Sequence, residues 1–359
     1  MNKKDCRQKP SAVDLFCGCG GLSFGFIVAG FRVVLGVDND EAALKTFSHN
    51  HSLSKALSAD LSCPAAIREI REIIGDHQTD VIIAGPPCQG FSLTGPRNFD
   101  DERNKLYLAV FKAVDVLKPK AFLIENVPGL ARLYGGEIKE EIIRRFERRE
   151  YHVSSQILCA ADYGVPQMRK RVFFVGLQRR FGRFVFPSPT HIEMSYVTCK
   201  EAISDLPSRK SELGQEEDEY EGQPQSLYQE RMRTGSRKLY NHVATKHTDL
   251  VKSVISQVPE GGDYRDLPRG VGESRRFNEA WTRYHSKKPS YTIDTGHRNH
   301  FHYKYNRVPT IRENARLQSF PDTFIFYGNR TQQNKQVGNA VPPLLGEHLG
   351  RQLLKYIRP

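Results

Sequence analysis

The sequence contains no apolar run that approaches the about 18 residues of a membrane-spanning helix. Its first ten residues, MNKKDCRQKP, have no apolar centre, so we expect neither a membrane helix nor a signal peptide. The 7 cysteines are odd in number, and only Cys17 and Cys19 lie close together. This spacing argues against a disulfide framework and against a metal site. We therefore expect a cytoplasmic protein in a reducing compartment, with no bound metal.

Acidic residues are fewer than basic ones: Asp and Glu total 41 and Lys and Arg total 53, which gives a formal net charge of +12. This surplus favours a polyanionic partner, most simply nucleic acid, although a well-solvated surface would have the same composition. The hydrophobic share of 38% and the charged share of 26% are typical of a globular protein. A chain of 359 residues suits one large domain with an insertion, or two domains.

Short apolar or β-branched runs alternate with helical patterns between residue 11 and about residue 180. The runs expected as strands are AVDLF, FRVVLGVD, DVIIAG, AFLIENV and RVFFVGL. The runs expected as helices are EAALKTFSHN, AAIREIREII, LYLAVFKAVDVL and EIKEEIIRRFERRE. This alternation predicts a doubly wound α/β domain with a largely parallel sheet.

The alternation stops near Pro187, and helical patterning returns at about residue 308. We expect an α/β domain over residues 11–185, completed by residues 332–359, and a second, smaller and irregular domain over residues 186–331. Aromatic and histidine residues are frequent in YNHVATKH and RYHSKKPSYTIDTGHRNHFHYKY. Their frequency favours a folded second domain over a floppy insertion.

A glycine-rich turn follows the first expected strand in AVDLFCGCGGLSFGF. Gly18, Gly20 and Gly21 would let the backbone approach a nucleotide-like ligand closely. Asp38 ends the second expected strand, where an acid binds ribose hydroxyls in Rossmann-like folds. A dinucleotide fingerprint requires glycine where this chain has Ser23, which argues against a nicotinamide cofactor. The pattern favours an adenosine-type cofactor, and a plain structural turn is the alternative.

The stretch DVIIAGPPCQGFS ends an expected strand with two prolines and then a cysteine. Pro86 and Pro87 each fix φ and remove a backbone donor, so the chain leading to Cys88 is stiff. Cys88 follows the carboxyl end of a strand, which is where open α/β sheets bind their ligands. We interpret Cys88 as a nucleophile, with a small buried packing residue as the alternative.

Charged residues flank two further expected strands. Glu125 ends the FLI run and is expected at the same edge of the sheet as Cys88, although an acid exposed at a strand end is an alternative. Arg169 and Arg171 alternate on entry to a strand, so we expect them to share one face. Two guanidinium groups beside a carboxylate and a thiol would form a pocket that binds anions and favours a thiolate.

These blocks resemble, in order, those of the bacterial DNA (cytosine-5)-methyltransferases of the restriction-modification type. The matching blocks are DLFCGCGG, GPPCQGFS, ENV, QMRKR, RENARLQSFPD and QVGNAVPP. They span residues 12 to about 185 and about 289 to 350, and residues 186–288 stand where that family has its variable target-recognition region. The resemblance implies a Rossmann-like S-adenosylmethionine-dependent methyltransferase domain with a smaller, irregular target-recognition domain and hinge.

The resemblance also implies a role for each matching residue. Cys88 would add to carbon 6 of a flipped-out cytosine, and Glu125, Arg169 and Arg171 would hold that base. The S-adenosylmethionine site would be formed by Phe16, Gly18, Gly20, Gly21, Asp38, Asn39, Asp60, Pro86, Asn339 and Val341. Contacts with DNA would come from Gln89, Ser92 and Arg103. Cys17 and Cys19 depart from the family's glycine loop and would make cofactor binding sensitive to oxidation.

The resulting hypothesis is an enzyme that transfers a methyl group from S-adenosylmethionine to carbon 5 of a cytosine within a specific double-stranded DNA sequence. It would act as a bacterial, nucleoid-associated monomer and form the modification half of a restriction-modification system, whose cognate endonuclease acts on the same site. Two alternatives stay open, an RNA (tRNA) cytosine-5 methyltransferase and a catalytically silent nucleic-acid-binding module. The recognition-sized stretch of about 100 residues favours DNA, and an intact Cys88, Glu125 and arginine pair favours activity.

Overall fold

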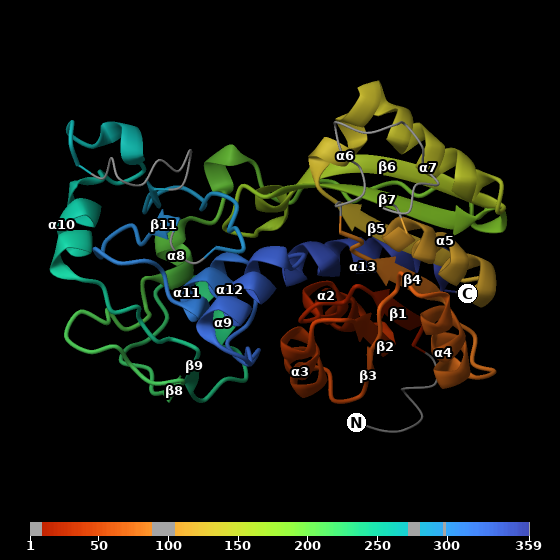
Figure 1. Ribbon diagram of the computed structural model, residues 1–359, viewed down its shortest axis with the longest axis horizontal. Coiled ribbons are helices and arrows are strands. Elements are labelled where there is room, and N and C mark those ends of the chain that lie inside the picture. Colours follow the sequence, from red (N-terminus) through yellow and green to blue (C-terminus); the bar gives the residue numbers. More distant parts are fainter. Residues whose placement is uncertain (1–8, 88–104, 272–280, 297–298, 359) are drawn as a thin grey trace. The chain divides into compact units, whose positions relative to one another are not determined.

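The computed structural model describes residues 9–87, 105–271, 281–296 and 299–358, and it divides into two compact units (Figure 1). Unit 1 comprises Met1–Cys159, Lys170–Ser188 and Pro343–Pro359. Unit 2 comprises Ala160–Arg169 and Pro189–Pro342. The sequence analysis placed the corresponding changes at residues 186 and 332, and it did not separate residues 160–169 from the first domain.

Unit 1 is built on a seven-stranded sheet with the order β3-β2-β1-β4-β5-β7-β6. Strands β1 to β5 are parallel, and β7 is antiparallel to both of its neighbours. The prediction of an α/β fold with a largely parallel sheet is therefore confirmed. The strands are β1 (Ser11–Leu15), β2 (Arg32–Asp38), β3 (Lys55–Ser58), β4 (Val81–Ala84), β5 (Ala121–Asn126), β6 (Tyr151–Cys159) and β7 (Lys170–Gln178).

Two of these strands, β3 and β6, were not predicted from the sequence. Both lie at edges of the sheet. Strand β3 has four residues, of which only Leu57 is buried, so it lacks the apolar run that identifies a buried strand. Strand β6 first alternates between buried and half-buried residues and then has four consecutive positions in its centre that are not buried.

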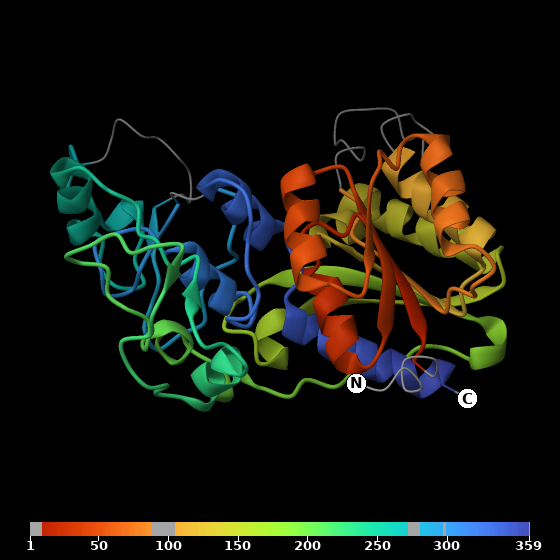
Figure 2. The ribbon, with the colours of Figure 1, turned by 90° about the horizontal axis from the view of Figure 1, so that it is seen from below.

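Helices cover both faces of this sheet (Figure 2). Several begin at residues suited to a helix start: Asp40 accepts a hydrogen bond from the amide of Ala43 (3.1 Å), and Pro64 occupies the first turn of its helix. The helices of unit 1 are α2 (Gly21–Ala29), α3 (Glu41–Asn50), α4 (Pro64–Ile74), α5 (Lys105–Leu117), α6 (Pro128–Arg132), α7 (Glu137–Glu147) and α13 (Pro343–Ile357).

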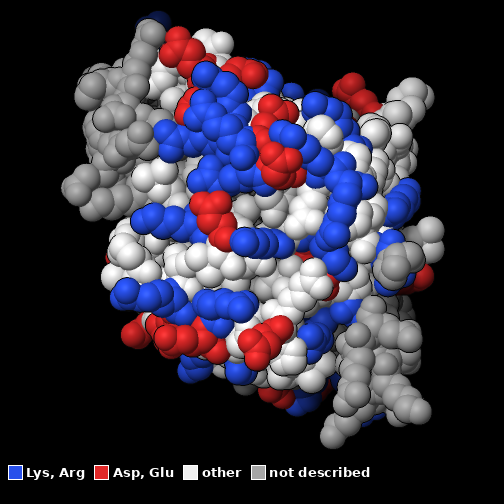
Figure 3. Space-filling view, turned by 90° about the vertical axis from the view of Figure 1, so that its right-hand side faces the viewer, with Lys and Arg blue, Asp and Glu red and all other residues white. Residues whose placement is uncertain are grey.

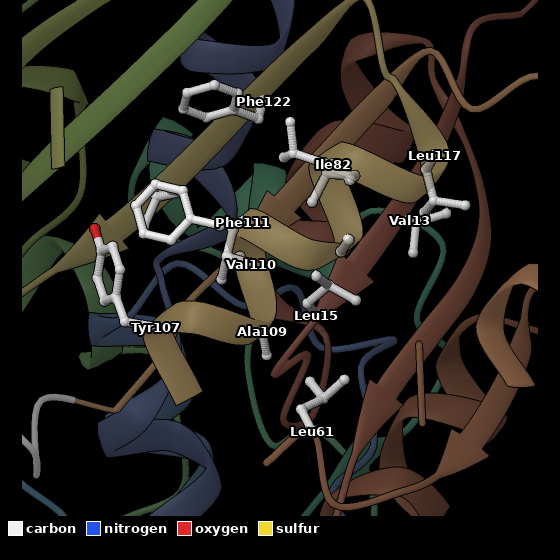
Figure 4. Close-up of a cluster of buried hydrophobic side chains, with 14 of the residues drawn as sticks. Val13, Leu15, Leu61, Ile82, Tyr107, Ala109, Val110, Phe111, Leu117 and Phe122 are labelled. Atoms are coloured by element: carbon white, nitrogen blue, oxygen red, sulfur yellow. The ribbon is translucent and has the colours of Figure 1, made fainter. Parts of the chain in front are cut away.

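A large hydrophobic cluster lies between the sheet and helices α4, α5 and α7 (Figure 4). Val13 and Leu15 of β1 point into it together because alternate residues of a strand share one face. Val110 and Phe111 of α5 pack against the same cluster. This packing fixes β1, β4 and β5 side by side, so that their carboxyl ends form one edge of the sheet.

Helices α2 and α13 pack against each other through glycines. A Cβ atom on Gly25 would lie 2.4 Å from the carbonyl oxygen of Pro343, and one on Gly350 would lie 2.8 Å from the Cβ of Ala29. Only residues without a side chain allow the two backbones to approach so closely. Helix α13 therefore belongs to the same packed unit as α2.

Unit 2 is irregular, as predicted, and its strands have only two residues each. In the ranges that the structure describes, no helix is long and apolar enough to cross a membrane. The elements of unit 2 are η3 (Ala160–Tyr163), η5 (Glu193–Ser195), α8 (Cys199–Ile203), β8 (Glu217–Asp218), α9 (Leu227–Arg233), β9 (Leu239–Tyr240), α10 (Asp249–Gln257), η6 (Tyr264–Asp266), β10 (Thr282–Arg283), β11 (His300–Phe301), α11 (Ile311–Leu317) and α12 (Arg330–Asn339).

Helix α11 is completely buried and carries the ionic centre of unit 2. The guanidinium of Arg316 donates to Asp205 (2.5 Å) and to both carboxylate oxygens of Asp322 (2.9 and 2.7 Å), and the three side chains are fully buried. One turn earlier, Glu313 accepts two hydrogen bonds of 2.7 Å from Arg307. Charged pairs thus occupy positions that apolar side chains fill in most cores.

Candidate active site

The glycine turn after β1 forms one side of the candidate site. The backbone turns at Phe16 (φ 60°), Gly18 (φ 53°) and Gly20 (φ 91°), and α2 begins at Gly21. A Cβ atom on Gly20 would lie 2.4 Å from the ring of His51, whereas one on Gly18 would meet nothing within 4 Å. Side chains therefore pack directly against Gly20, whereas the space beside Gly18 is not filled by protein atoms.

His51 supports this turn from behind and was not identified from the sequence. Its ring stacks on Phe47, with ring centroids 4.3 Å apart and 7° between the planes, and it meets the edge of Phe24 at 6.3 Å. Burial lowers the pKa of His51 to about 4, so the ring is neutral near pH 7. No local pattern could have indicated this role, because His51 lies far along the chain from Gly20.

Asp38, at the end of β2, holds the glycine turn in place. Its Oδ2 accepts a hydrogen bond from the amide of Gly18 (2.8 Å), and its Oδ1 accepts from the amides of Asn39 (2.8 Å) and Asp40 (2.9 Å). A carboxylate offers about four acceptor positions. Because three are used and the side chain is half-buried, one position remains for a ligand hydroxyl.

Asp60 lies at the neighbouring strand end, just after β3. The amide of Ala59 donates to the carbonyl of Asp38 (3.0 Å), which joins the two strand ends. The Asp60 side chain is exposed, and its hydrogen bonds with Ser62 lower its pKa. The structure thus brings Phe16, the three glycines, Asp38, Asn39 and Asp60 to one edge of the sheet.

Asn339 and Val341 belong to unit 2 instead. Asn339 ends α12, and its carbonyl accepts a hydrogen bond from Nη2 of Arg169 (3.5 Å). Val341 is buried. Their expected part in the cofactor site stays a prediction.

Asp14, inside β1, is a buried acid that the sequence analysis did not single out. Its Oδ2 accepts a 2.6 Å hydrogen bond from the hydroxyl of Ser23 on α2. Burial, together with the nearby charge of Asp38, raises the pKa of Asp14 to about 8 even though Ser23 acts in the opposite direction. The bond also explains why serine stands where a dinucleotide fingerprint has glycine. The available signal was an acid within an otherwise apolar run.

The raised pKa of Asp14 predicts that Asp14→Asn changes the pH dependence of stability. The folded protein holds a proton on Asp14 up to about pH 8, whereas the unfolded chain releases it near pH 4, so stability falls as pH rises through that range. The amide that replaces the carboxyl group has no proton to release and removes this slope. Urea unfolding between pH 5 and pH 9 measures the effect, with the exposed Asp76→Asn as control. Parallel profiles for wild type and Asp14→Asn would contradict the prediction.

Cys17 and Cys19 are both buried within the glycine turn. Burial raises the pKa of Cys17 well above its usual value and that of Cys19 to about 12. Oxidation requires a thiolate that solvent can reach. Their burial therefore argues against the expected sensitivity of the site to oxidation.

The Gly-Pro-Pro turn after β4 forms the second side of the candidate site. The amide of Gly85 donates to the carbonyl of Leu15 (3.2 Å), which continues the β1–β4 ladder by one residue. The carbonyl of Pro86 accepts a 3.0 Å hydrogen bond from the buried amide of Asn126. Asn126 was not singled out, although it lies within the block ENV. The predicted site residues Cys88, Gln89, Ser92 and Arg103 lie outside the described residues.

Glu125 and Arg171 form an ion pair beside this turn. Nε of Arg171 lies 2.9 Å from Oε1 of Glu125. The side chain of Arg171 is 14% exposed and that of Glu125 is 11% exposed. A Cβ atom on Gly85 would lie 3.6 Å from the other oxygen, Oε2. The structure therefore brings the predicted acid and one predicted arginine to the turn that precedes Cys88.

Arg169 lies outside the strand that was expected to carry it, because β7 begins at Lys170. It belongs to unit 2, is 1% exposed, and donates to the carbonyls of Ile293 (3.4 Å) and Asn339 (3.5 Å). Within unit 1 the structure thus pairs Glu125 with Arg171, and the role of Arg169 stays a prediction. Over the described ranges, no group of three or more His, Cys, Asp or Glu residues is arranged to hold a metal ion.

Comparisons with known proteins show the family to which this chain belongs. The family model described as "C-5 cytosine-specific DNA methylase" matches residues 11–355. Type II methyltransferase M.DdeI of Desulfomicrobium norvegicum is 37% identical over 96% of this chain and 88% of its own length. Type II methyltransferase M1.HphI of Haemophilus parahaemolyticus is 38% identical over 96% of this chain and 86% of its own length.

Solved structures agree with this result. A prophage-encoded E. coli protein assigned as a DNA modification methyltransferase has a TM-score of 0.79 at 27% identity, covering 98% of this chain and 100% of that one. Dnmt2 of S. pombe has a TM-score of 0.58 at 15% identity, covering 97% and 99%, which shows a common fold. The chain belongs to the C-5 cytosine-specific DNA methylase family.

Proposed function

We propose that this DNA cytosine-5 methyltransferase uses S-adenosylmethionine as methyl donor and Cys88 as its nucleophile. The observation that carries the proposal is the Glu125–Arg171 ion pair, which lies beside the turn Gly85–Pro86–Pro87. The next residue in the chain is Cys88. A base-holding acid and a nucleophile would therefore meet at one edge of the sheet.

The glycine turn fits an adenosine-type methyl donor. The space beside Gly18 admits a ligand, and Asp38 keeps one acceptor position for a ribose hydroxyl. Asp60 follows the next strand and would accept from the adenine amino group. S-adenosylmethionine, when bound, supplies an electrophilic methyl group attached to a sulfonium.

Cys88 provides the activation that cytosine requires. When its thiolate adds to carbon 6, the ring becomes an enamine and carbon 5 becomes nucleophilic towards a methyl group. Loss of the proton on carbon 5 to a base then restores the double bond and releases the thiolate. A free thiol has a pKa of about 8.5, so nearby positive charge such as that of Arg171 would favour the reactive form.

Glu125 would hold the cytosine while this addition occurs. Arg171 contacts Oε1. The carboxyl group would accept a hydrogen bond from the exocyclic amino group, and in its protonated form it would donate one to ring nitrogen 3. A hydrogen bond at nitrogen 3 draws electron density away from carbon 6 and makes attack easier. The target base must leave the duplex to reach these groups, which costs a few kcal/mol.

The assignment of functions to the chain's segments is part of this proposal. Residues 11–185 with 332–359 would perform catalysis and bind the cofactor, and residues 186–331 would read base edges in the target sequence. The relatives named above are Type II methyltransferases. We therefore propose that this protein protects the site cut by a cognate restriction endonuclease, acting as a monomer.

Trapping with 5-fluorocytosine tests the nucleophile directly. We expect a denaturant-resistant complex between the protein and duplex DNA in which 5-fluorocytosine replaces cytosine, formed only with S-adenosylmethionine. Fluorine cannot leave carbon 5 as a cation, so methylation proceeds but the bond to sulfur does not break. Full replacement in random-sequence DNA presents the target cytosine whatever the recognition sequence is. Gel electrophoresis under denaturing conditions measures the complex.

Two variants and one substrate serve as controls. Cys88→Ala should abolish the complex, while Cys63→Ala, at an exposed cysteine after β3, should leave it unchanged. Fluorinated RNA should not trap the protein, and trapping on RNA alone would favour an RNA substrate. The absence of an adduct on DNA, with the cofactor bound, would show that Cys88 is not the nucleophile.

A further inference from the structure

Unit 1 has a groove of about 620 Å³ on the side where β7 ends. Its charged walls come from three segments: Asp115 and Lys118 at the end of α5, Arg149 and Glu150 after α7, and Arg179 and Arg180 after β7. The floor includes the buried Tyr151 and Val114. Four basic and two acidic side chains thus surround one depression.

Two of the arginines form ion pairs with the acids. Arg149 donates to both carboxylate oxygens of Asp115 (2.7 and 2.9 Å) and lies over the ring of Phe111. Arg179 pairs with Glu150 at 2.9 Å. Among the described residues, no acid lies within 4 Å of the remaining cations, Lys118 and Arg180. The acids therefore position two cations, and two further cations are left to bind a ligand.

The positive charge extends beyond the groove. The space-filling view of this side shows many Lys and Arg side chains over the face, with smaller groups of acidic residues between them (Figure 3). Arg144 and Arg148 on and after α7 and Arg183 after β7 are exposed. Protein–protein interfaces have an apolar centre, whereas the outer surface here carries mainly charged groups. The chemistry that fits is a chain of phosphates, which Lys and Arg neutralise with release of counterions.

The groove lies far from the candidate active site. Arg171 is near the start of β7 and Arg179 follows its end, so the strand separates them by about 25 Å at about 3.3 Å per residue. The two residues lie at opposite ends of β7, and residues of β7 between them belong to the hydrophobic cluster. DNA is stiff over about 150 base pairs, so one short duplex at the catalytic edge would not bend round to the groove.

We propose that the groove binds a second segment of double-stranded DNA while the first segment occupies the active site. This inference rests on the proposed function, because it takes DNA as the occupant. Two simultaneous DNA contacts allow the protein to pass directly from one segment to another. The groove then contributes to the search for target sites and not to methyl transfer itself.

Dissociation kinetics test this proposal with the full-length protein. A labelled duplex of about 30 base pairs is bound, and its dissociation is followed by stopped-flow fluorescence at rising concentrations of the unlabelled duplex. Direct transfer makes the dissociation rate rise with competitor concentration, at least about threefold, because the competitor binds before the label leaves. In Arg179→Glu with Arg180→Glu, we expect a rate independent of competitor.

The matched control is Arg68→Glu with Arg71→Glu on α4, where Glu69 and Glu72 alternate with the exposed arginines. It makes the same change in net charge and should keep the competitor dependence of wild type. Methyl transfer to the same DNA is measured in parallel. Its absence would contradict the proposed function. Two results would overturn this inference alone while methyl transfer is observed. The first is a wild-type dissociation rate that does not change with competitor concentration. The second is a groove variant whose dissociation rate depends on competitor as in wild type, which would fit an acidic protein partner.

Discussion

Replacing Arg316 with methionine is expected to lower the free energy of unfolding of unit 2 by about 3–5 kcal/mol. The guanidinium is fully buried and neutralises Asp205 and Asp322, which are also fully buried. Removing it leaves Asp205 facing only Arg233, at 3.4 Å, and leaves Asp322 with Arg312, at 3.7 Å, and the hydroxyl of Tyr220. A buried charge that loses its partner costs far more than the pair contributes when intact.

The pH dependence of this effect has a definite sign. In the wild type, burial acts to raise the pKa of Asp322, but Arg316, Arg312 and the hydroxyl of Tyr220 together hold that pKa below its usual value. The ionised form therefore stabilises the folded state above about pH 4, and this contribution is lost as pH falls. In Arg316→Met the buried carboxylate of Asp322 loses its main counter-charge and favours protonation instead, so the difference between variant and wild type should shrink towards pH 4.

Hydrogen exchange resolved by segment measures this loss in unit 2, and urea unfolding gives its size. Arg237→Met, at an exposed arginine of the same unit, should change stability by less than about 0.5 kcal/mol. Adding Asp205→Asn to Arg316→Met should recover part of the loss, because it removes one unpaired charge. Equal stability of Arg316→Met and wild type would show that the buried ionic centre does not form as described.

Replacing Arg171 with alanine is expected to slow methyl transfer by about 10²–10³-fold. Its guanidinium fixes Oε1 of Glu125 at 2.9 Å and places positive charge beside the Gly-Pro-Pro turn. Without it the carboxylate loses this contact and would hold the base poorly. Arg171→Lys keeps the positive charge but lacks the planar guanidinium group with its fixed donors, so an intermediate rate is expected.

Single-turnover transfer of labelled methyl groups to unmethylated DNA measures the rate. Arg32→Ala, at an exposed arginine where β2 begins, should remain within about twofold of wild type. In a Glu125→Gln background, Arg171→Ala should cause little further loss, because the two residues act as one unit. Additive losses, or a normal rate for Arg171→Ala, would remove the ion pair from the mechanism.

The elements that were predicted correctly are those in which a short stretch of sequence shows the pattern of buried residues. Strands β4 and β5 appear as uninterrupted apolar runs, and α4 shows apolar residues at helical spacing. Strands β3 and β6 are edge strands with exposed positions, so their pairing depends on neighbours that are distant in the chain. Edge strands therefore leave a weak local signal.

The candidate site divides in the same way. Asp38 and Glu125 stand at strand ends and Gly20 in the turn after β1, where the order of strands and turns already indicates a ligand site. His51 and Asn126 act through contacts that folding alone creates, behind Gly20 and on Pro86. Arg169 and Arg171 are two residues apart in sequence but belong to different units, because the chain changes unit between Arg169 and Lys170. Spacing in the sequence could not reveal that boundary.

The packing of α2 against α13 determines when unit 1 can be completed during synthesis. Leu22, Phe26 and Ala29 of α2 are buried in the finished protein, yet their partner helix begins about 300 residues later. At about 5–20 residues per second, the ribosome takes roughly 15–60 s to deliver that partner. Over this interval the glycine-rich face of α2 has no helix to cover it. Helix α2 lies near the start of the described chain but is among the last to gain its packing partner, so its apolar face stays open to non-native contacts for most of synthesis.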